Sequence, residues 1–285
     1  MNFKKRILLI IFLIAFIIFV FIYYNNLEKR IISKNNYEKL ELDNNYIIDN
    51  KERYIAYKEK NKNLNNDKII TYVNIGLDKG FYNKIEKVDL NKNNKILVNK
   101  FNKLNKDYEP NDLELINNKN FIEGNNSVKR LKKEAKIAFE KLSNDSINNN
   151  TPVYGQSAYR SYKTQETIYN NEIKNYGIKI ADKQVARPGF SEHQTGLAID
   201  VSSTKKGNML NFENTKSFLW MKYNAHKYGF ILRYPKNKEA IHGYIYEPWH
   251  YRYVGIKIAT NIYNNYKNIT YDEYYVKYLN KKKST

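Results

Sequence analysis

Two short segments, far apart in the chain, carry side chains that would have to meet at one point, and this requirement constrains the fold most. The first segment runs from Ser191 to Asp200 and contains His193, and the second runs from Glu247 to His250. Two imidazoles and one carboxylate, those of His193, His250 and Asp200, form a three-ligand set for zinc with one coordination position left open. The nearby second carboxylate, Glu247, is what a hydrolytic zinc site requires in addition.

The choice of ligands is narrow because the chain has only four histidines: His193, His226, His242 and His250. A lone histidine is more often a hydrogen-bonded core residue or a surface residue than a ligand, and we interpret His226 and His242 as structural. A closed structural zinc site in a chain without cysteine would more commonly use four side chains. Three nitrogen and oxygen ligands therefore favour a catalytic metal.

Asp200 ends the apolar run Leu197–Ile199, which predicts a buried strand. An unpaired buried charge is costly, so this carboxylate needs a partner. A metal ion would provide one, and an arginine or backbone amides are the alternatives. Gly196 is expected to permit a tight turn between His193 and Asp200.

Both segments resemble a known family. Ser-Glu-His-Gln-Thr-Gly-Leu-Ala-Ile-Asp (191–200) and Glu-Pro-Trp-His-Tyr-Arg-Tyr-Val-Gly (247–255) are similar to the two signatures of VanY-type D-alanyl-D-alanine carboxypeptidases, zinc peptidases that trim bacterial cell-wall stem peptides. The resemblance also includes residues 157–162, Gln165, 224–230 and 233–235, in the same order and spacing. It covers about residues 95–260.

Spacing alone leaves the role of Glu247 open, because residues three apart on a regular strand point to opposite faces. Glu247 could pair with a surface lysine, or a kink at Pro248 could turn it toward the metal beside His250. The resemblance implies the second arrangement, since the general base of the family stands at this position. Glu247 would then take the proton of a zinc-activated water.

A carboxypeptidase must recognise a free C-terminal carboxylate, which a planar guanidinium can bind through two parallel hydrogen bonds. The resemblance implies this role for Arg160, with Gln165 and Ser191 as polar helpers. From the residues alone, Arg160 could instead be a stacked surface side chain. Trp249 and Tyr159 could wall the pocket or belong to the core.

The resemblance implies a zinc carboxypeptidase, with one Zn²⁺ per catalytic domain, that removes the C-terminal D-alanine from peptidoglycan stem peptides. Both D,D- and L,D-carboxypeptidase activity are compatible with these residues. One alternative is a zinc endopeptidase of peptidoglycan, against which Arg160 argues, since an internal bond has no adjacent carboxylate. The other is a non-catalytic wall-binding module, against which the presence of Glu247 and all three ligands argues.

The net charge of the chain is +20, because 49 lysine and arginine residues outnumber 29 aspartate and glutamate residues. Such an excess could suit nucleic acid, an anionic cell wall or a membrane surface. The charges are scattered and form no recognised nucleic-acid module, so we expect no nucleic-acid partner. The absence of cysteine excludes disulfides and a cysteine-ligated zinc finger.

Residues Ile7–Tyr24 form an uninterrupted apolar and aromatic run of 18 residues, preceded by Lys4, Lys5 and Arg6. This length is near the lower limit for a membrane-spanning helix. The run does not end in the small residues of a signal-peptide cleavage site. We therefore expect an uncleaved, single-pass signal anchor in the cell membrane, with a cytoplasmic tail and an extracellular catalytic domain.

The rest of the pattern predicts an α+β fold with a small antiparallel sheet and flanking helices, preceded by the transmembrane anchor. Expected helices cover about 127–142 (capped by Ser127), 163–176 and 215–228 (ending at Gly229), and expected strands cover 153–158, 197–202 and 244–254. The expected parts of the chain are an anchor at 1–24, a stalk at 25–50, a small extended or β subdomain or wrapping arm at 51–94, the catalytic domain at 95–270 and a basic tail at 271–285. The run Ile69–Val73 suggested the β character of the third part.

Overall fold

The computed structural model describes residues 3–124 and 129–280, apart from the side chains of residues 4–10 and 28–39. The chain divides into two compact units, of which the first ends at Val73 and the second begins at Asn74. The helices are α1 (Phe3–Glu41), α2 (Lys51–Lys60), α3 (Asn66–Ile75), α4 (Lys133–Asn148), α5 (Tyr162–Tyr176), α6 (Ile178–Gln184), α7 (Lys216–Asn224), α8 (Glu239–His242), α9 (Ile256–Asn265) and α10 (Tyr271–Tyr274). The strands are β1 (Glu86–Lys87), β2 (Asn102–Lys103), β3 (Leu113–Leu115), β4 (Arg130–Lys132), β5 (Tyr154–Ser157), β6 (Ala198–Ser202), β7 (Phe230–Leu232) and β8 (His250–Tyr253).

The first unit opens with α1, a helix of 39 residues. Within the described part of the chain, no helix combines the length and the apolar character that crossing a membrane requires. The anchor expected at 1–24 is therefore not confirmed and stays a prediction; residues 1–2 and the side chains of 4–10 lie outside the described residues. The stalk expected at 25–50 is helical as far as Glu41.

The extended or β subdomain expected at 51–94 is wrong over its first part, which forms α2 and α3. The run that suggested a strand is helical because its apolar side chains occupy one helix face and are buried there together. Packing of this kind outweighs the strand preference of isoleucine and valine. The buried cluster consists of Leu40, Tyr54, Ile69, Ile70 and Val73.

The second unit is built around a four-stranded antiparallel sheet with the order β5-β6-β8-β7. This confirms the predicted mixed fold with a small antiparallel sheet. Asp200 on β6 is paired with His250 on β8 and, across a β-bulge, with Ser157 on β5. The register of the sheet thus fixes two of the three predicted ligands side by side. Elsewhere β1 pairs with β2, and β3 with β4.

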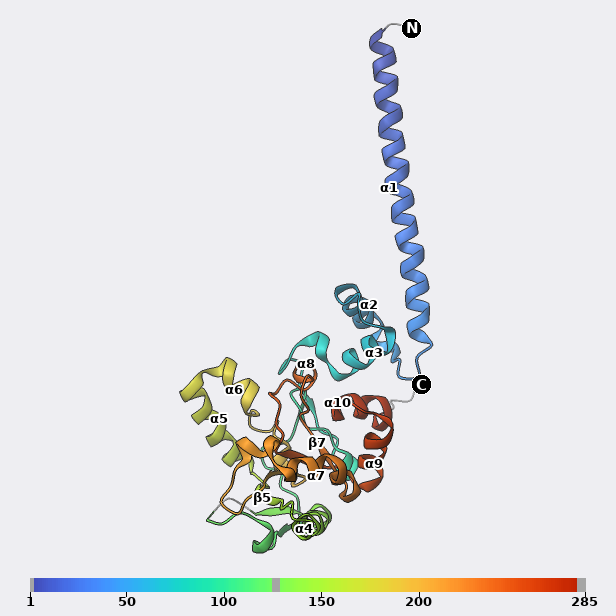
Figure 1. Ribbon diagram of the computed structural model, residues 1–285. Coiled ribbons are helices and arrows are strands. Elements are labelled where there is room, and N and C mark those ends of the chain that lie inside the picture. The colour runs from blue at the N-terminus through green and yellow to red at the C-terminus, as the bar shows by residue number, and fades with distance from the viewer. Residues whose placement is uncertain (1–2, 125–128, 281–285) are drawn as a thin grey trace. The chain divides into compact units, whose positions relative to one another are not determined.

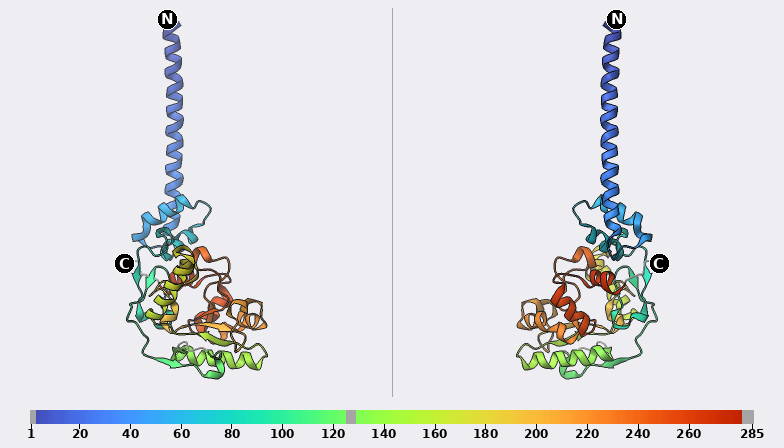
Figure 2. Two further views of the ribbon diagram at one scale, coloured as in Figure 1. Left: turned by 90° about the vertical axis from the view of Figure 1, so that its left-hand side faces the viewer. Right: turned by 90° about the vertical axis from the view of Figure 1, so that its right-hand side faces the viewer.

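Helices cover this sheet from several sides. In Figure 1, α5 and α6 lie on the side of the second unit opposite α9 and α10, and both views of Figure 2 agree. The apolar face of α4, with Ala135, Phe139 and Leu142 at helical spacing, is fully buried in the main core. Ile199 and Val201 of β6 belong to the same core.

The sequence predicted three helices and three strands of the second unit, and each has a counterpart among the described residues. The helix expected at 163–176 is α5, and the one expected at 215–228 is α7 followed by a 3-10 turn that ends at Gly229. The helix expected from residue 127 begins only at Lys133, since residues 130–132 pair as β4, and Ser127 lies outside the described residues. The strand expected at 244–254 is confirmed only over β8.

The basic tail expected at 271–285 is wrong as far as residue 279, because α10 and the π-helical turn Tyr275–Leu279 are part of the second unit. Residues 271–276 are buried. Asp272 forms an ion pair with Arg233, with 2.6 Å between its Oδ2 and Nη1 of the arginine. Arg233 is remote from this segment in the sequence, so the charges of the segment alone wrongly predicted a basic tail. Residues 281–285 lie outside the described residues.

Candidate active site

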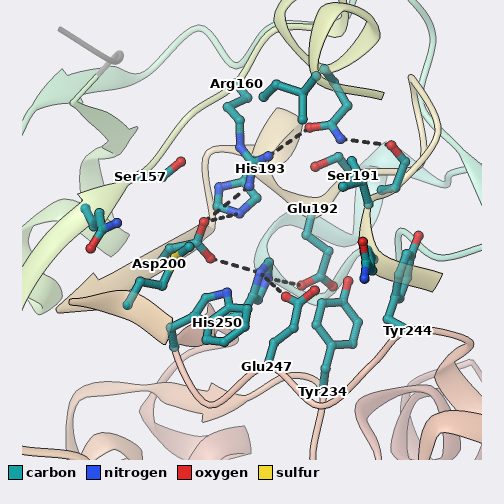
Figure 3. Close-up of a pocket in the computed structure, with 18 of the residues that line it drawn as sticks. Ser157, Arg160, Ser191, Glu192, His193, Asp200, Tyr234, Tyr244, Glu247 and His250 are labelled. Carbon is teal, nitrogen blue, oxygen red and sulfur yellow. Dashed lines mark hydrogen bonds and ion pairs between the residues drawn. The ribbon is translucent and has the colours of Figure 1, made fainter. Parts of the chain in front are cut away.

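The sheet and the turn before β6 bring the three predicted metal ligands together (Figure 3). Asp200 and His250 lie on neighbouring strands, and His193 lies on the 3-10 turn Glu192–Thr195. That turn ends at Gly196, whose φ of +67° is in the left-handed region that glycine adopts most readily, as expected. The candidate ligand atoms of the three residues all lie within 4.8 Å of one another.

The donor atoms of this site fit a metal ion. Nδ1 of His193 lies 2.7 Å from the carbonyl oxygen of Ala158, so the Nδ1–H donates there and the Nε2 lone pair faces Asp200. Nε2 of His193 and Oδ1 of Asp200 are buried without a hydrogen-bond partner among the described residues. Buried polar atoms of this kind require an explanation, and two imidazoles with one carboxylate are a zinc donor set.

The protonation states of His193 and Asp200 suit metal ligands. Burial, reinforced by the charge of Arg160, lowers the pKa of His193 to about 4, so its imidazole is neutral at pH 7. Burial alone would raise the pKa of Asp200, but the imidazoles of His193 and His250 outweigh this and hold its pKa well below the usual range. A neutral imidazole and an ionised carboxylate are the forms that bind metal.

His250 is surrounded by carboxylates. Its Nδ1 lies 3.2 Å from Oδ1 of Asp200 and 3.4 Å from Oε2 of Glu247, and its Nε2 lies 3.6 Å from Oε2 of Glu192. Burial opposes protonation of this imidazole, yet these acidic neighbours raise its pKa well above the usual range. The site therefore attracts positive charge, as a cation-binding site must.

Glu247 converges on the same point, as the kink at Pro248 was expected to allow. The residue lies in the turn before β8, and the backbone N–H of His250 donates to the Glu247 carbonyl over 3.1 Å. Its side chain is almost completely buried at the pocket wall. Burial raises the pKa of Glu247 despite the opposing effect of His250, which brings this carboxyl closer to the range of an effective general base.

Arg160 lies between β5 and α5, on the opposite wall of the pocket from Glu247 (Figure 3). Its Nη1 donates to Oε1 of Gln165 over 3.1 Å, and Gln165 Nε2 donates to the Ala186 carbonyl over 2.8 Å. Its Nη2 lies 3.3 Å from Oδ2 of Asp200. The guanidinium is thus held directly beside the predicted metal ligands, while its Nε has no hydrogen-bond partner in the described chain.

These side chains line a cavity of about 570 Å³. Ser191, Trp249 and Tyr159 line it too, so both aromatic residues are at the pocket wall. The remaining histidines, which we interpret as structural, do not line the pocket: His226 stacks on Tyr263, and His242 packs against Tyr234. The full lining consists of Gln156, Ser157, Tyr159, Arg160, Thr164, Gln165, Ile168, Gln184, Val185, Ala186, Ser191, Glu192, His193, Asp200, Met209, Tyr234, Tyr244, Glu247, Trp249 and His250.

Sequence reasoning gave no role to Glu192, although it stands next to a predicted ligand. Glu192 is completely buried, and its Oε1 accepts from Nε of Arg233 over 2.8 Å and from Nη1 of Arg252 over 2.7 Å. Its only sequence signal was its position next to His193. Tyr234 and Tyr244, which also line the pocket, carried no such signal.

Comparison with known proteins gives a consistent set of relatives. The family model described as "VanY: D-alanyl-D-alanine carboxypeptidase" matches residues 128–256. The YodJ protein of Bacillus subtilis (strain 168) is 42% identical over 209 residues, which are 70% of this chain and 76% of YodJ. A D-alanyl-D-alanine carboxypeptidase of Enterococcus faecalis is 38% identical over 38% of this chain and 42% of its own.

Solved structures agree with the sequence relatives. The LdcB LD-carboxypeptidase, described with its peptidoglycan recognition, is 40% identical with a TM-score of 0.62, over 68% of this chain and 90% of its own. VanYB in complex with D-alanine-D-alanine is 31% identical with a TM-score of 0.53, over 64% of this chain and 96% of its own. A point mutant of the D,D-pentapeptidase VanY, from the VanB-type resistance cassette and in complex with Zn(II), has the same identity and TM-score, over 64% of this chain and 98% of its own.

Proposed function

This chain belongs to the family of VanY-type D-alanyl-D-alanine carboxypeptidases, and we propose that it is a zinc-dependent carboxypeptidase that removes the C-terminal D-alanine from peptidoglycan stem peptides. The main support is the meeting of two functions in one pocket. His193, Asp200 and His250 offer a three-ligand metal set, and Arg160 lies 3.3 Å from Asp200. If Arg160 binds the C-terminal carboxylate of a peptide, the last peptide bond of that peptide would therefore lie at the predicted metal site.

His193, Asp200 and His250 would hold the zinc ion, which supplies an activated water and a positive charge for the developing oxyanion. Arg160 binds the substrate carboxylate and so places the last peptide bond against the metal-binding residues. Glu247 takes the proton of the attacking water and passes it to the leaving amine. Burial of these groups excludes bulk water, which strengthens each electrostatic interaction.

The substrate class is supported by the relatives. LdcB is described as an LD-carboxypeptidase that recognises peptidoglycan, and VanYB was solved with D-alanine-D-alanine. We propose a stem peptide that ends in D-alanine as the substrate. Cleavage before that residue releases D-alanine in both cases. Loss of alanine from the pentapeptide indicates D,D-activity, and loss from the tetrapeptide, where D-alanine follows an L-residue, indicates L,D-activity.

The test is mass spectrometry of purified muropeptides, as pentapeptide monomers, tetrapeptide monomers and cross-linked dimers, after incubation with the full-length protein in detergent. We expect the loss of one alanine from one or both substrates. Activity should disappear after chelation and return with zinc, and Glu247→Gln protein should serve as the inactive control. Release of cross-linked partners without loss of terminal alanine would identify an endopeptidase. No product with zinc-loaded protein would overturn the proposal in favour of a wall-binding module.

We also propose that the catalytic unit is extracellular and that residues 1–24 anchor it to the cell membrane. The support is the apolar run Ile7–Tyr24 with its basic flank, together with a substrate class that lies outside the membrane. Protease added to intact, wall-stripped cells should degrade the catalytic unit. Protection of this unit would reverse the proposed topology, and a mature N-terminus near residue 25 would show that the segment is cleaved.

A further inference from the structure

The two ring nitrogens of His250 face different carboxylates (Figure 3). Nδ1 faces Asp200 and Glu247, whereas Nε2 faces Oε2 of Glu192 at 3.6 Å. Nε2 of His250 and Oε2 of Glu192 are both buried, and neither has a hydrogen-bond partner among the described residues. These two atoms would form a hydrogen bond if they moved slightly closer, because 3.6 Å is only a little longer than a hydrogen bond.

Glu192 is held so that only one of its oxygens is available to His250. Its Oε1 accepts from both Arg233 and Arg252, at 2.8 and 2.7 Å. Arg252 is two residues from His250 on β8, so both side chains leave the same face of the strand. Arg252 in turn donates from Nη2 to the Ile96 carbonyl over 2.8 Å. The carboxylate is therefore fixed from two sides, with Oε2 directed toward the imidazole.

The charges of this buried cluster balance. Arg233 also pairs with Asp272 of α10 over 2.6 Å, and Asn99 donates to Asp272 over 2.7 Å. Two arginines thus face two carboxylates, and all four side chains are buried. Asp272 and Glu192 both neutralise Arg233, but only Glu192 lies beside His250. Loss of the Asp272 charge therefore affects only the charge balance of the cluster, whereas loss of the Glu192 charge also affects the surroundings of His250.

We propose that Glu192 is a positioning residue: it accepts a hydrogen bond from Nε2–H of His250 and thereby fixes the ring with Nδ1 toward the metal. Histidines that bind metals commonly donate their other ring N–H to a carboxylate or carbonyl, which sets their tautomer and orientation. His193 does the same with the Ala158 carbonyl. The inference rests on the zinc site of the proposed function.

The test compares Glu192→Gln with Asp272→Asn, which each remove one negative charge from the same buried cluster. The zinc dissociation constant of each full-length protein is measured by competition with a chromogenic chelator. The free energy of unfolding of each metal-free protein is measured in denaturant. We expect both variants to be destabilised, but only Glu192→Gln to bind zinc about 10- to 100-fold more weakly, the usual effect of losing such a partner. The visible absorption bands of the Co²⁺-substituted protein should change in the same variant alone.

Equal zinc affinity in wild-type and Glu192→Gln protein would overturn the inference, and so would an equal loss of affinity in Asp272→Asn. If Glu192→Gln does not fold, Glu192→Gln with Arg252→Gln restores the charge balance and serves in its place. Wild-type zinc affinity in that double variant would show that Glu192 only neutralises the arginines. Failure of the wild-type protein to bind zinc would instead refute the proposed function.

Discussion

The two walls of the pocket are built in different ways. On the metal side, Asp200 and His250 are paired across β6 and β8, so the backbone register of the sheet sets their separation. On the side that would bind the substrate carboxylate, Arg160 precedes α5, and its position depends on side-chain hydrogen bonds to Gln165 and on contact with Asp200. A sheet register changes only at high cost, whereas a guanidinium can exchange one partner for another.

This difference indicates a division of labour. We expect the predicted metal-binding side to be preorganised before substrate arrives, and the Arg160 side to adjust when a carboxylate binds. Two backbone-linked contacts join the sides: Nδ1–H of His193 donates to the Ala158 carbonyl over 2.7 Å, and the Arg160 N–H donates to the His193 carbonyl over 3.3 Å. Substitutions on the metal side should therefore abolish catalysis, and those on the Arg160 side should chiefly weaken substrate binding.

The largest effect is expected from His193→Ala combined with His250→Ala. Removal of two of three ligands should abolish stoichiometric zinc binding and with it activity, because a single carboxylate does not hold zinc in competition with water. Metal analysis of the purified protein after dialysis against zinc checks this. Full zinc retention in the double variant would show that the metal is bound elsewhere.

Glu247→Gln should come next in size. The amide keeps the shape of the side chain but cannot take a proton, so we expect kcat to fall about 10²- to 10⁴-fold. Zinc content should remain at the wild-type level, since Glu247 is not one of the proposed ligands. Steady-state kinetics and metal analysis on the same preparation show whether kcat falls while the zinc content is retained. Loss of zinc together with activity would instead make Glu247 a ligand.

Arg160→Lys should have a smaller effect, mainly on KM. Lysine keeps the positive charge but loses the two-pronged grip on a carboxylate, and we expect KM to rise about 10-fold or more. A fall in kcat of about 10-fold with unchanged KM would show that Arg160 acts on the transition state. The two walls would then not differ in the way proposed.

Gln165→Ala should have the smallest effect. It removes the amide that holds Nη1 of Arg160 and the link to the Ala186 carbonyl. Loss of one hydrogen bond of about 1 kcal/mol should raise KM about five-fold. Thr164→Ala, at a neighbouring position of the pocket lining, is the matched control and should change KM less. A larger effect in the control would remove Gln165 from the substrate-binding wall.

Short-range patterns in the sequence were sufficient to predict the three-ligand set, whereas the roles of Glu247 and Arg160 came from the family resemblance. The spacing of His193 and Asp200 required only a glycine-assisted turn followed by a strand, and the structure has both. Helix α5, expected at 163–176, begins one residue earlier and ends at Tyr176 as expected. These features depend on neighbours along the chain, which is the information that propensity and periodicity contain.

The errors lie where distant segments decide the structure. Ile69, Ile70 and Val73 suggested a strand, but packing against Leu40 and Tyr54 makes them one face of a helix. Residues 271–285 were expected to form a basic tail, but Asp272 is buried in an ion pair with Arg233. Glu192 had no visible partner in sequence, since Arg233 and Arg252 reach it only in the folded chain. Such pairings have no local signature.

The most direct test of a metal site combined with a carboxylate-binding arginine is to compare two stem peptides that differ only at the C-terminus. One peptide ends in free D-alanine and the other in the D-alanine amide, and zinc-loaded wild-type protein is incubated with each. Mass spectrometry should show the loss of one terminal residue from the free acid, with the amide cleaved much more slowly. Arg160→Lys should narrow this difference by slowing the free acid alone. Equal cleavage of both peptides by the wild-type protein would contradict the role of Arg160 and favour an endopeptidase.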